Sequence, residues 1–221
     1  APYKHPVSGT LRVHEIYLSL QGESTFAGLP CVFIRLTGCD LRCSYCDTAY
    51  AFTGGETLTL DSILEQTTAL AEGYPEPPLV ELTGGEPLLQ KETPALLAAL
   101  ADRGFTVLLE TSGAHDISGL DARVHRIVDL KCPSSGESER NLSTNLQHLR
   151  ASDEVKCVIS TREDYDWAKA QLRQLFGKCE VLFSWVNPLE AGQQSDVLKP
   201  VPADHTPLTR RELAEAITAD R

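Results

Sequence analysis

The sequence predicts an α/β fold in which six parallel strands curve into an incomplete (β/α)6 barrel. Strand-like and helix-like segments alternate along the chain, and a polar motif follows most of the predicted strands. Repeated strand, helix, strand units imply parallel pairing with right-handed crossovers, so the helices cover the outside of the sheet. Because ligands in such folds bind beyond the carboxyl ends of the strands, the polar motifs predict one active site along one rim.

The predicted elements follow from apolar runs and from their flanking residues. Strands are expected at residues 31–37, 79–82, 105–110, 125–130, 154–159 and 179–184. A helix is expected from Thr59, a suitable N-cap, to Gly73, and another at residues 94–103 before Gly104. Further helices are expected near residues 141–149 and 163–176 and from Thr209. No low-complexity linker or repeat interrupts the series, so we expect a single domain over residues 1–221.

Composition restricts the class of protein. The chain has 221 residues, enough to bury a core without crosslinks, and a formal net charge of -11, which argues against a grip on nucleic-acid phosphates. No apolar run approaches the roughly 20 residues of a membrane span, and residues 1–10 show no signal-peptide pattern. The seven cysteines are an odd number and suit a reducing compartment. We therefore expect a cytoplasmic protein with a small-molecule substrate and no nucleic-acid or membrane partner.

Three cysteines, Cys39, Cys43 and Cys46, stand as Cys-x3-Cys-x2-Cys directly after the first predicted strand. A four-iron four-sulfur cluster normally takes four thiolates, so a set of three leaves one iron open for chemistry. The alternative is a zinc site, because Cys-x2-Cys is a common half of one. Zinc would need a distant cysteine or histidine as its fourth ligand, and none has companion ligand spacing.

Two further motifs follow the second and third predicted strands. Thr83-Gly84-Gly85-Glu86-Pro87 allows a close backbone approach to a ligand, since glycine has no side chain, although a tight turn would look the same. Glu110, with the Thr and Ser after it, is placed to bind a ribose or a carboxylate, or else is ordinary surface.

Asp129 and Lys131 flank the exit of the fourth predicted strand. A lysine in this place can meet a cofactor carboxylate as a point charge. A surface ion pair between the two residues is the equal alternative.

A polar turn, Leu20-Gln21-Gly22-Glu23, precedes the first predicted strand. Its amide, backbone and carboxylate are suited to the donors and acceptors of a heterocycle. Without further context, a β-turn with exposed polar residues would explain it equally well.

These motifs occur together and in an order that is similar to that of a known protein family. The series is Leu-Gln-Gly-Glu, then Arg35 in Phe-Ile-Arg-Leu-Thr-Gly-Cys, then Cys-Ser-Tyr-Cys-Asp-Thr, Thr-Gly-Gly-Glu-Pro and Glu-Thr-Ser-Gly. From about Val13 to Asn187 the sequence resembles the 7-carboxy-7-deazaguanine synthases of the radical S-adenosylmethionine (radical SAM) superfamily. The resemblance implies a barrel of the radical SAM type and a carbon–nitrogen lyase that converts 6-carboxy-5,6,7,8-tetrahydropterin to 7-carboxy-7-deazaguanine with loss of ammonia. Such a lyase belongs to deazapurine biosynthesis, on the route to the tRNA base queuosine.

The resemblance also implies cofactors, partners and residue roles. The cofactors are a 4Fe–4S cluster, S-adenosylmethionine and Mg²⁺, and the partners are a pterin substrate, a reductase such as flavodoxin and a second copy in a homodimer. Cluster ligands are Cys39, Cys43 and Cys46, and Thr48 offers a hydroxyl to magnesium. Residues facing S-adenosylmethionine are Tyr45, Cys46, Asp47, Gly85, Glu110, Asp129, Leu130 and Lys131. Residues facing the substrate are Leu20, Gln21, Gly22, Arg35 and Thr83, with Arg35 toward the substrate carboxylate.

Two departures and two alternatives accompany this interpretation. Family members usually end with a further strand that carries a His-Lys pair, which we expect to be absent from residues 1–221, and residues 183–196 align only loosely. One alternative is an activase that installs a glycyl radical on a partner protein, which shares the cysteine loop but lacks the Leu-Gln-Gly-Glu lead with its downstream Arg35. The other is a non-catalytic metal-binding module, either a zinc site or an electron-transfer iron–sulfur site.

Overall fold

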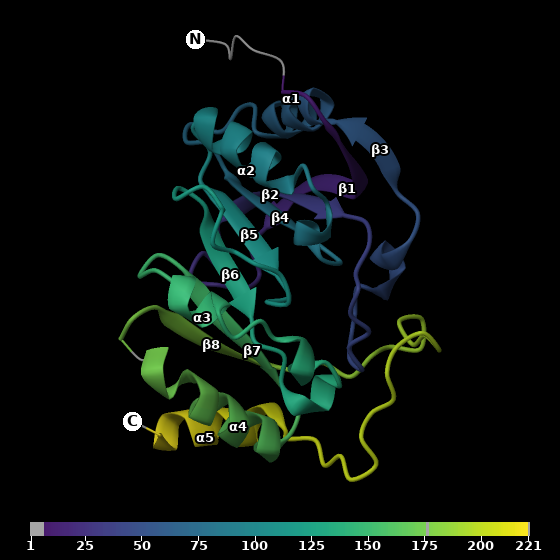
Figure 1. Cartoon of the computed structure of the whole chain (residues 1–221), viewed down its shortest axis with the longest axis vertical. Helices are drawn as coiled ribbons and strands as arrows, with labels where there is room; N and C mark the ends of the chain where they lie inside the picture. The colour runs from purple at the N-terminus through teal and green to yellow at the C-terminus, as the bar shows by residue number, and fades with distance from the viewer. Residues whose placement is uncertain (1–6, 176, 221) are drawn as a thin grey trace. The chain divides into compact units, whose positions relative to one another are not determined.

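A computed structural model describes residues 7–175 and 177–220 of the chain (Figure 1). The chain divides into two compact units. Unit 1 comprises Ala1–Asp40, Tyr50–Thr111 and Ile117–Ile127, and unit 2 comprises Leu41–Ala49, Ser112–Asp116 and Val128–Arg221. Strand β6 (His125–Asp129) contributes residues to both units. The division also falls inside the cysteine loop, with Cys39 in unit 1 and Cys43 and Cys46 in unit 2.

Unit 1 is a sheet with helices on one face. Its strands are β1 (Thr10–Leu20), β2 (Pro30–Leu36), β3 (Glu56–Thr59), β4 (Leu79–Gly84) and β5 (Val107–Thr111), in the order β3-β1-β2-β4-β5. Its helices are α1 (Leu60–Leu70) and α2 (Thr93–Asp102), with 3-10 turns η1 (Ala49–Phe52) and η2 (Pro87–Leu89). Strand β4 runs parallel to β2 and to β5, as predicted.

The two antiparallel strands of unit 1 were not predicted. Strand β1 pairs antiparallel with β2, and β3 pairs antiparallel with β1. The apolar alternation that marks a strand is clear only at the start of β1, where Leu11 and Val13 are buried, and it fades along the half-buried residues that follow. A register irregularity lies between Val13 and Glu15, and Glu15 stands opposite Arg35 of β2.

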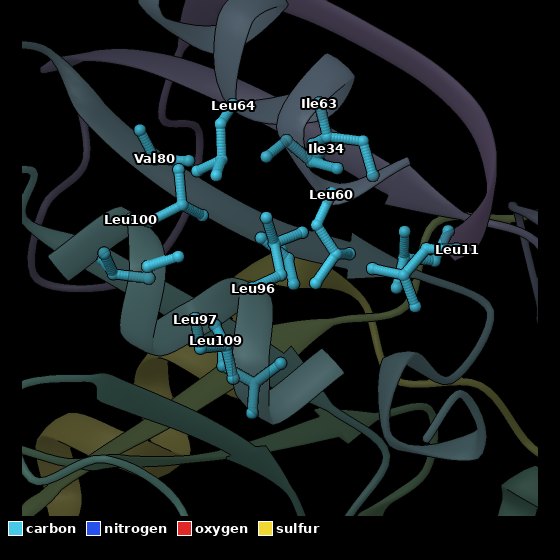
Figure 2. Packing of buried hydrophobic residues seen from close by; sticks show 14 of the residues in the cluster. Leu11, Ile34, Leu60, Ile63, Leu64, Val80, Leu96, Leu97, Leu100 and Leu109 are labelled. Atoms are coloured by element: carbon cyan, nitrogen blue, oxygen red, sulfur yellow. The ribbon is translucent and has the colours of Figure 1, made fainter. Parts of the chain in front are cut away.

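The main core of unit 1 lies between the helices and one face of the sheet. Figure 2 shows leucines of α1 and α2 meeting aliphatic side chains of the strands. The helix side chains are Leu60, Ile63, Leu64, Leu96, Leu97 and Leu100, and the strand side chains include Val32, Ile34, Val80 and Leu82. Each such burial stabilises the fold by about 1.5–3 kcal/mol, so this face holds the helices on the outside of the sheet, as predicted.

The opposite face of the same strands carries the polar residues. Because strand side chains alternate between faces, Arg35 shares its face with Phe33, and Thr83 shares its face with Glu81 and Leu79. A second apolar cluster on this face contains Cys31, Phe33, Leu79, Leu108 and Ile127. On this face of the sheet, apolar side chains form a cluster, and polar side chains lie toward the carboxyl ends of the strands.

Unit 2 contains two parallel strands and the C-terminal helices. The strands are β7 (Glu154–Ile159) and β8 (Glu180–Trp185), and the helices are α3 (Asn145–His148), α4 (Arg162–Leu172) and α5 (Arg210–Ala219). Three 3-10 turns, η3 (Pro133–Ser135), η4 (Ser138–Arg140) and η5 (Arg173–Leu175), complete the unit. Helices α4 and α5 lie side by side (Figure 1), joined where the Tyr165 hydroxyl donates to Asp220 at 3.0 Å.

Most predicted helices are confirmed, and one is wrong over most of its length. Thr59 caps α1 by accepting from the backbone N–H of Ser62, and Thr209 caps α5 in a capping box. Of the helix expected near residues 141–149, only α3 forms. Asn141 instead exchanges two hydrogen bonds with the backbone of Lys131, and the Asn145 amide donates to loop carbonyls, so both side chains compete with helix formation.

Two of the predictions fall partly on residues outside those that the structure describes. Residue 176, the last of the helix expected at 163–176, lies outside the described residues, as do residues 1–6 of the N-terminal segment. No described helix has the length and apolar character needed to cross a bilayer.

Candidate functional site

The predicted site residues separate between the two units. Unit 1 holds Cys39, every residue expected to face the substrate, and two of the residues expected to face the cofactor: Leu20, Gln21, Gly22, Arg35 and Thr83 for the substrate, and Gly85 and Glu110 for the cofactor. Unit 2 holds the other two cysteines, the expected magnesium ligand Thr48 and most residues expected to face the cofactor: Cys43, Tyr45, Cys46, Asp47, Asp129, Leu130 and Lys131. All seven cysteines are thiols rather than disulfides.

In unit 1, the glycine pair after β4 packs against the start of the cysteine loop. A Cβ atom on Gly84 or Gly85 would lie well inside van der Waals contact of the Leu36 or Gly38 carbonyl, respectively, and one on Gly85 would also be 2.8 Å from the Cys39 Cβ. Gly84 also has a φ of 142°, which side-chain-bearing residues rarely adopt. Only glycine fits at these two positions, which places the motif directly beside Cys39.

Glu86 links the contact between Gly85 and Gly38 to the neighbouring strand β5. Its backbone N–H donates to the Gly38 carbonyl at 2.8 Å, and its fully buried carboxylate accepts the Thr111 hydroxyl at 2.9 Å and the Leu88 N–H at 2.8 Å. The ends of β2, β4 and β5 are therefore tied together. The motif also forms the turn η2, so the alternative of a tight turn describes the part of the motif after Glu86.

Thr83 and Glu110, assigned to substrate and cofactor respectively, touch each other. The Thr83 hydroxyl donates to a Glu110 carboxylate oxygen at 2.7 Å, from adjacent strands. The contact places both residues at one point on the carboxyl rim of unit 1.

The polar turn at Gln21 is bonded both to β4 and within itself. The Gln21 amide donates to Glu81 and accepts from the Glu23 N–H at 3.0 Å, while Leu20 stays 61% exposed. Contact of these residues with a substrate stays a prediction. Glu81, which is buried in β4, was missed, although an acid within the apolar run Leu79–Leu82 was a visible signal.

Arg35 is held from the neighbouring strand. Its Nε donates to Glu15 at 2.7 Å and its Nη2 donates to the Tyr17 hydroxyl at 3.2 Å. Burial alone would lower the pKa of the guanidinium, but Glu15 and the nearby tyrosines raise it above its ordinary value. Arg35 is therefore a fixed positive charge on the polar face of unit 1.

In unit 2, the second half of the cysteine loop is held by the segment after β6. The Ser44 N–H donates to the Ser135 carbonyl at 3.0 Å, and the Ser44 hydroxyl donates to the Ser134 carbonyl at 2.6 Å. The Cys46 N–H donates to the Cys43 carbonyl at 3.2 Å, which forms a turn between these two cysteines.

Glu137 and Lys199 make a second attachment to this half of the loop. The buried Glu137 carboxylate accepts the Arg42 N–H at 2.6 Å and pairs with the Lys199 ammonium at 2.9 Å. The Lys199 N–H in turn donates to the Arg42 carbonyl at 2.8 Å. Sequence reasoning missed both residues, since nothing local marks a lysine at position 199 as a partner of the loop.

The donor set fits an iron–sulfur cluster chemically. Burial raises the pKa of Cys43 and of Cys46, and binding of a metal to cysteine thiols releases their protons. Within residues 7–175 and 177–220, no group of three or more His, Cys, Asp and Glu side chains is already arranged as a metal site.

Asp129 and Lys131 form an ion pair, as the alternative expected, but it is largely buried rather than on the surface. The two side chains are only 11% and 13% exposed, and Lys156 approaches the other Asp129 oxygen at 3.5 Å. Burial opposes the charge on Lys131, yet Asp129, Cys43 and Tyr45 raise the pKa of the ammonium well above its ordinary value. The Leu130 N–H donates to the Lys156 carbonyl at 2.8 Å, which secures this stretch to β7.

Thr48, the expected magnesium ligand, lies beside a second oxygen donor. Its hydroxyl donates to the Asp47 carboxylate at 2.8 Å. A hydroxyl next to a carboxylate suits a hard cation such as Mg²⁺.

Comparison with known proteins identifies the superfamily. The family model described as the radical SAM superfamily matches residues 33–169, so the fold and the cysteine loop define a radical SAM protein. The fold class predicted from the sequence is confirmed. A 4Fe–4S cluster and S-adenosylmethionine are the cofactors of this superfamily.

Individual relatives narrow the assignment. The 7-carboxy-7-deazaguanine synthase of Chlorobaculum tepidum is 45% identical over 179 residues, which cover 78% of this chain and 79% of the relative. That of Koribacter versatilis is 46% identical over 165 residues, covering 74% and 71% respectively. The chain belongs to the 7-carboxy-7-deazaguanine synthase family, which favours the predicted lyase over the activase and the metal-binding module.

Solved structures support the fold. The crystal structure of QueE from Escherichia coli has a TM-score of 0.68 at 22% identity, covering 96% of this chain and 91% of that chain. SuiB from Streptococcus suis bound to S-adenosylmethionine has a TM-score of 0.59 at 14% identity, covering 83% of this chain and 45% of that chain.

Proposed function

We propose that this chain converts 6-carboxy-5,6,7,8-tetrahydropterin to 7-carboxy-7-deazaguanine with loss of ammonia. The observation that carries the proposal is the packing of Gly85 against Gly38 and Cys39, because it joins the glycine motif to the cysteine loop in one site. The names of the relatives support the substrate and the product.

The residues present fit the cofactors of such a reaction. Cys39, Cys43 and Cys46 would hold the 4Fe–4S cluster, and Thr48 would bind Mg²⁺. S-adenosylmethionine would lie against residues 45–47, Gly85, Glu110 and residues 129–131. When bound, the cluster and S-adenosylmethionine supply a radical that removes a hydrogen atom from the substrate.

The side chains orient the substrate and the cofactor and place positively charged groups beside their carboxylates. Arg35 holds the substrate carboxylate, while Thr83 and residues 20–22 hold the pterin ring. Lys131, fixed by Asp129, offers its ammonium to the carboxylate of the cofactor.

The remaining parts of the proposal concern partners and organisation. We expect a reductase such as flavodoxin to supply the electron, and a homodimer to be the working form. Residues 1–221 would act as a single radical SAM domain in the cytoplasm, a location that suits seven thiols.

Anaerobic turnover tests the proposal. Reconstituted enzyme, given the carboxylated pterin, S-adenosylmethionine, Mg²⁺ and a reductant, should release ammonia and form a deazapurine chromophore. Cys43→Ala should abolish turnover, whereas Cys179→Ala, a half-buried cysteine outside the motif, should retain it. A fully loaded wild-type enzyme that leaves the pterin unchanged would contradict the proposal.

Magnesium binding at Thr48 is tested separately. Thr48→Ala should lower turnover less severely than Cys43→Ala and should raise the Mg²⁺ concentration needed for half-maximal rate. An unchanged Mg²⁺ dependence would remove Thr48 from the metal site.

A further inference from the structure

Arg35 lies in an enclosed frame made by its own unit. Its guanidinium faces Glu15 and Tyr17 of β1, and the ring of Tyr50, from the turn η1, lies 5.8 Å from the guanidinium carbon. The Arg35 side chain is only 14% exposed. A long cationic side chain with this little freedom has one orientation rather than many.

Glu15 is the centre of the frame. A single oxygen, Oε1, accepts from Arg35 Nε at 2.7 Å and from the Tyr50 hydroxyl at 3.1 Å. Glu15 stands opposite Arg35 at the end of a regular register that runs to Leu20 and Pro30, directly beside the irregularity between Val13 and Glu15.

The frame uses only part of the guanidinium. Arginine has five N–H donors, and the hydrogen bonds to Glu15 and Tyr17 use two of them, at Nε and Nη2. The other three, including both on Nη1, suit the planar, two-point grip of a carboxylate. The acid on β1 therefore orients the arginine without using up its capacity to bind an anion.

We propose that Glu15 is a positioning residue that aims the Arg35 guanidinium at the carboxylate of the substrate, with Tyr17 and Tyr50 completing the frame. This inference rests on the proposed function, which supplies a carboxylated pterin. A competing role is physically possible for any acid beside an arginine, because a neutralised guanidinium attracts a second carboxylate less strongly. The two roles predict opposite changes in affinity when Glu15 is removed.

Equilibrium binding distinguishes the two roles. Cluster-loaded enzyme with S-adenosylmethionine but no reductant, which cannot turn over, would be titrated with the carboxylated pterin and with its carboxamide analogue. Glu15→Ala frees Arg35, so it should weaken binding of the carboxylate by about three- to tenfold, the cost of immobilising one long side chain. Binding of the carboxamide should not change.

Conservative variants sharpen the test. Glu15→Gln keeps the Oε1 acceptor for Arg35 Nε and should recover most of the lost affinity. Asp121→Ala, which removes an acid paired with the half-exposed Arg123 of the same unit, is the matched control and should change neither affinity. Circular dichroism of each variant should match wild type.

The possible results separate the inference from the proposed function. Tighter carboxylate binding in Glu15→Ala and Glu15→Gln would show competition and overturn the inference, as would an equal loss for both ligands, which indicates a merely structural role. Unchanged binding in Glu15→Ala would overturn it as well. Wild-type enzyme that binds neither pterin would contradict the proposed function itself, and the inference with it.

Discussion

The two halves of the cysteine loop are held in different ways. Residues 37–40, in unit 1, are held by backbone packed on backbone at Gly84 and Gly85. Residues 41–49, in unit 2, are held by hydrogen bonds rather than by close packing, and these include an ion pair between the side chains of Glu137 and Lys199. A backbone contact leaves no room for adjustment, whereas a side-chain attachment can weaken by degrees. We therefore expect the first half to be intolerant of substitution and the second half to be sensitive to charge.

The largest effect is expected at Gly85. Gly85→Ala would drive a Cβ into the Gly38 carbonyl, and backbone cannot turn aside as a flexible side chain can. We expect a loss of at least about 3 kcal/mol in the free energy of unfolding, the upper end for overpacking, together with failure to retain the cluster. Urea denaturation and iron analysis measure the two effects.

Gly119→Ala is the matched control for this substitution. No heavy atom lies within 4 Å of the position that its Cβ would take. Near-wild-type stability of Gly85→Ala would remove the distinction between the two halves of the loop.

The next effect is expected at Glu137. Glu137→Ala leaves the Arg42 N–H without its buried acceptor and the Lys199 ammonium without its carboxylate, which should cost about 1–3 kcal/mol. The loop should also release iron faster to a chelator, a rate that the loss of visible absorbance reports. Unchanged chelation kinetics would show that residues 41–49 need no such attachment.

A comparable or smaller effect is expected at Thr111 in unit 1. Thr111→Val keeps the shape but removes the hydroxyl that donates to the buried Glu86 carboxylate, at a cost of about 1–2 kcal/mol. Thermal unfolding measures the loss, and Thr106→Val, an exposed threonine of the same unit, is the control. A larger loss than that of Gly85→Ala would show that the Glu86 carboxylate, rather than the glycine contact, holds the first half.

The smallest effect is expected at Lys199. Its side chain is 44% exposed, and Glu137 keeps the hydrogen bond from the Arg42 N–H, so Lys199→Met should cost less than Glu137→Ala. Added salt should narrow the difference from wild type, because a partly exposed ion pair is screened. A difference that is independent of salt would mean that the hydrogen bond from the Lys199 ammonium to the Gly136 carbonyl, and not the ion pair with Glu137, is what the loop needs.

The sequence predicted what depends on local patterns. Apolar runs located the parallel strands, Thr59 and Thr209 marked helix starts, and the spacing of Cys39, Cys43 and Cys46 marked the cluster loop. The order of these motifs along the chain was enough to identify the family.

Pairings between distant segments could not be predicted in the same way. Glu15 becomes a partner of Arg35 only through the antiparallel register of β1 and β2, and the polar character of β1 conceals that strand. Glu137 and Lys199 meet because of tertiary folding alone. Glu81 is the exception, since its position in an apolar strand was a signal present in the sequence.

The attachment at Lys199 has a consequence for biosynthesis. A ribosome delivers Cys43 and Cys46 long before it delivers residue 199, so the nascent chain exposes these thiols while their last support is still missing. Domains begin to fold during translation, in chain order. Iron that reaches the finished polypeptide would therefore bind a loop already held by Lys199. Iron that reaches the nascent chain would meet the same thiols before that contact has formed, when they are still exposed to oxidation.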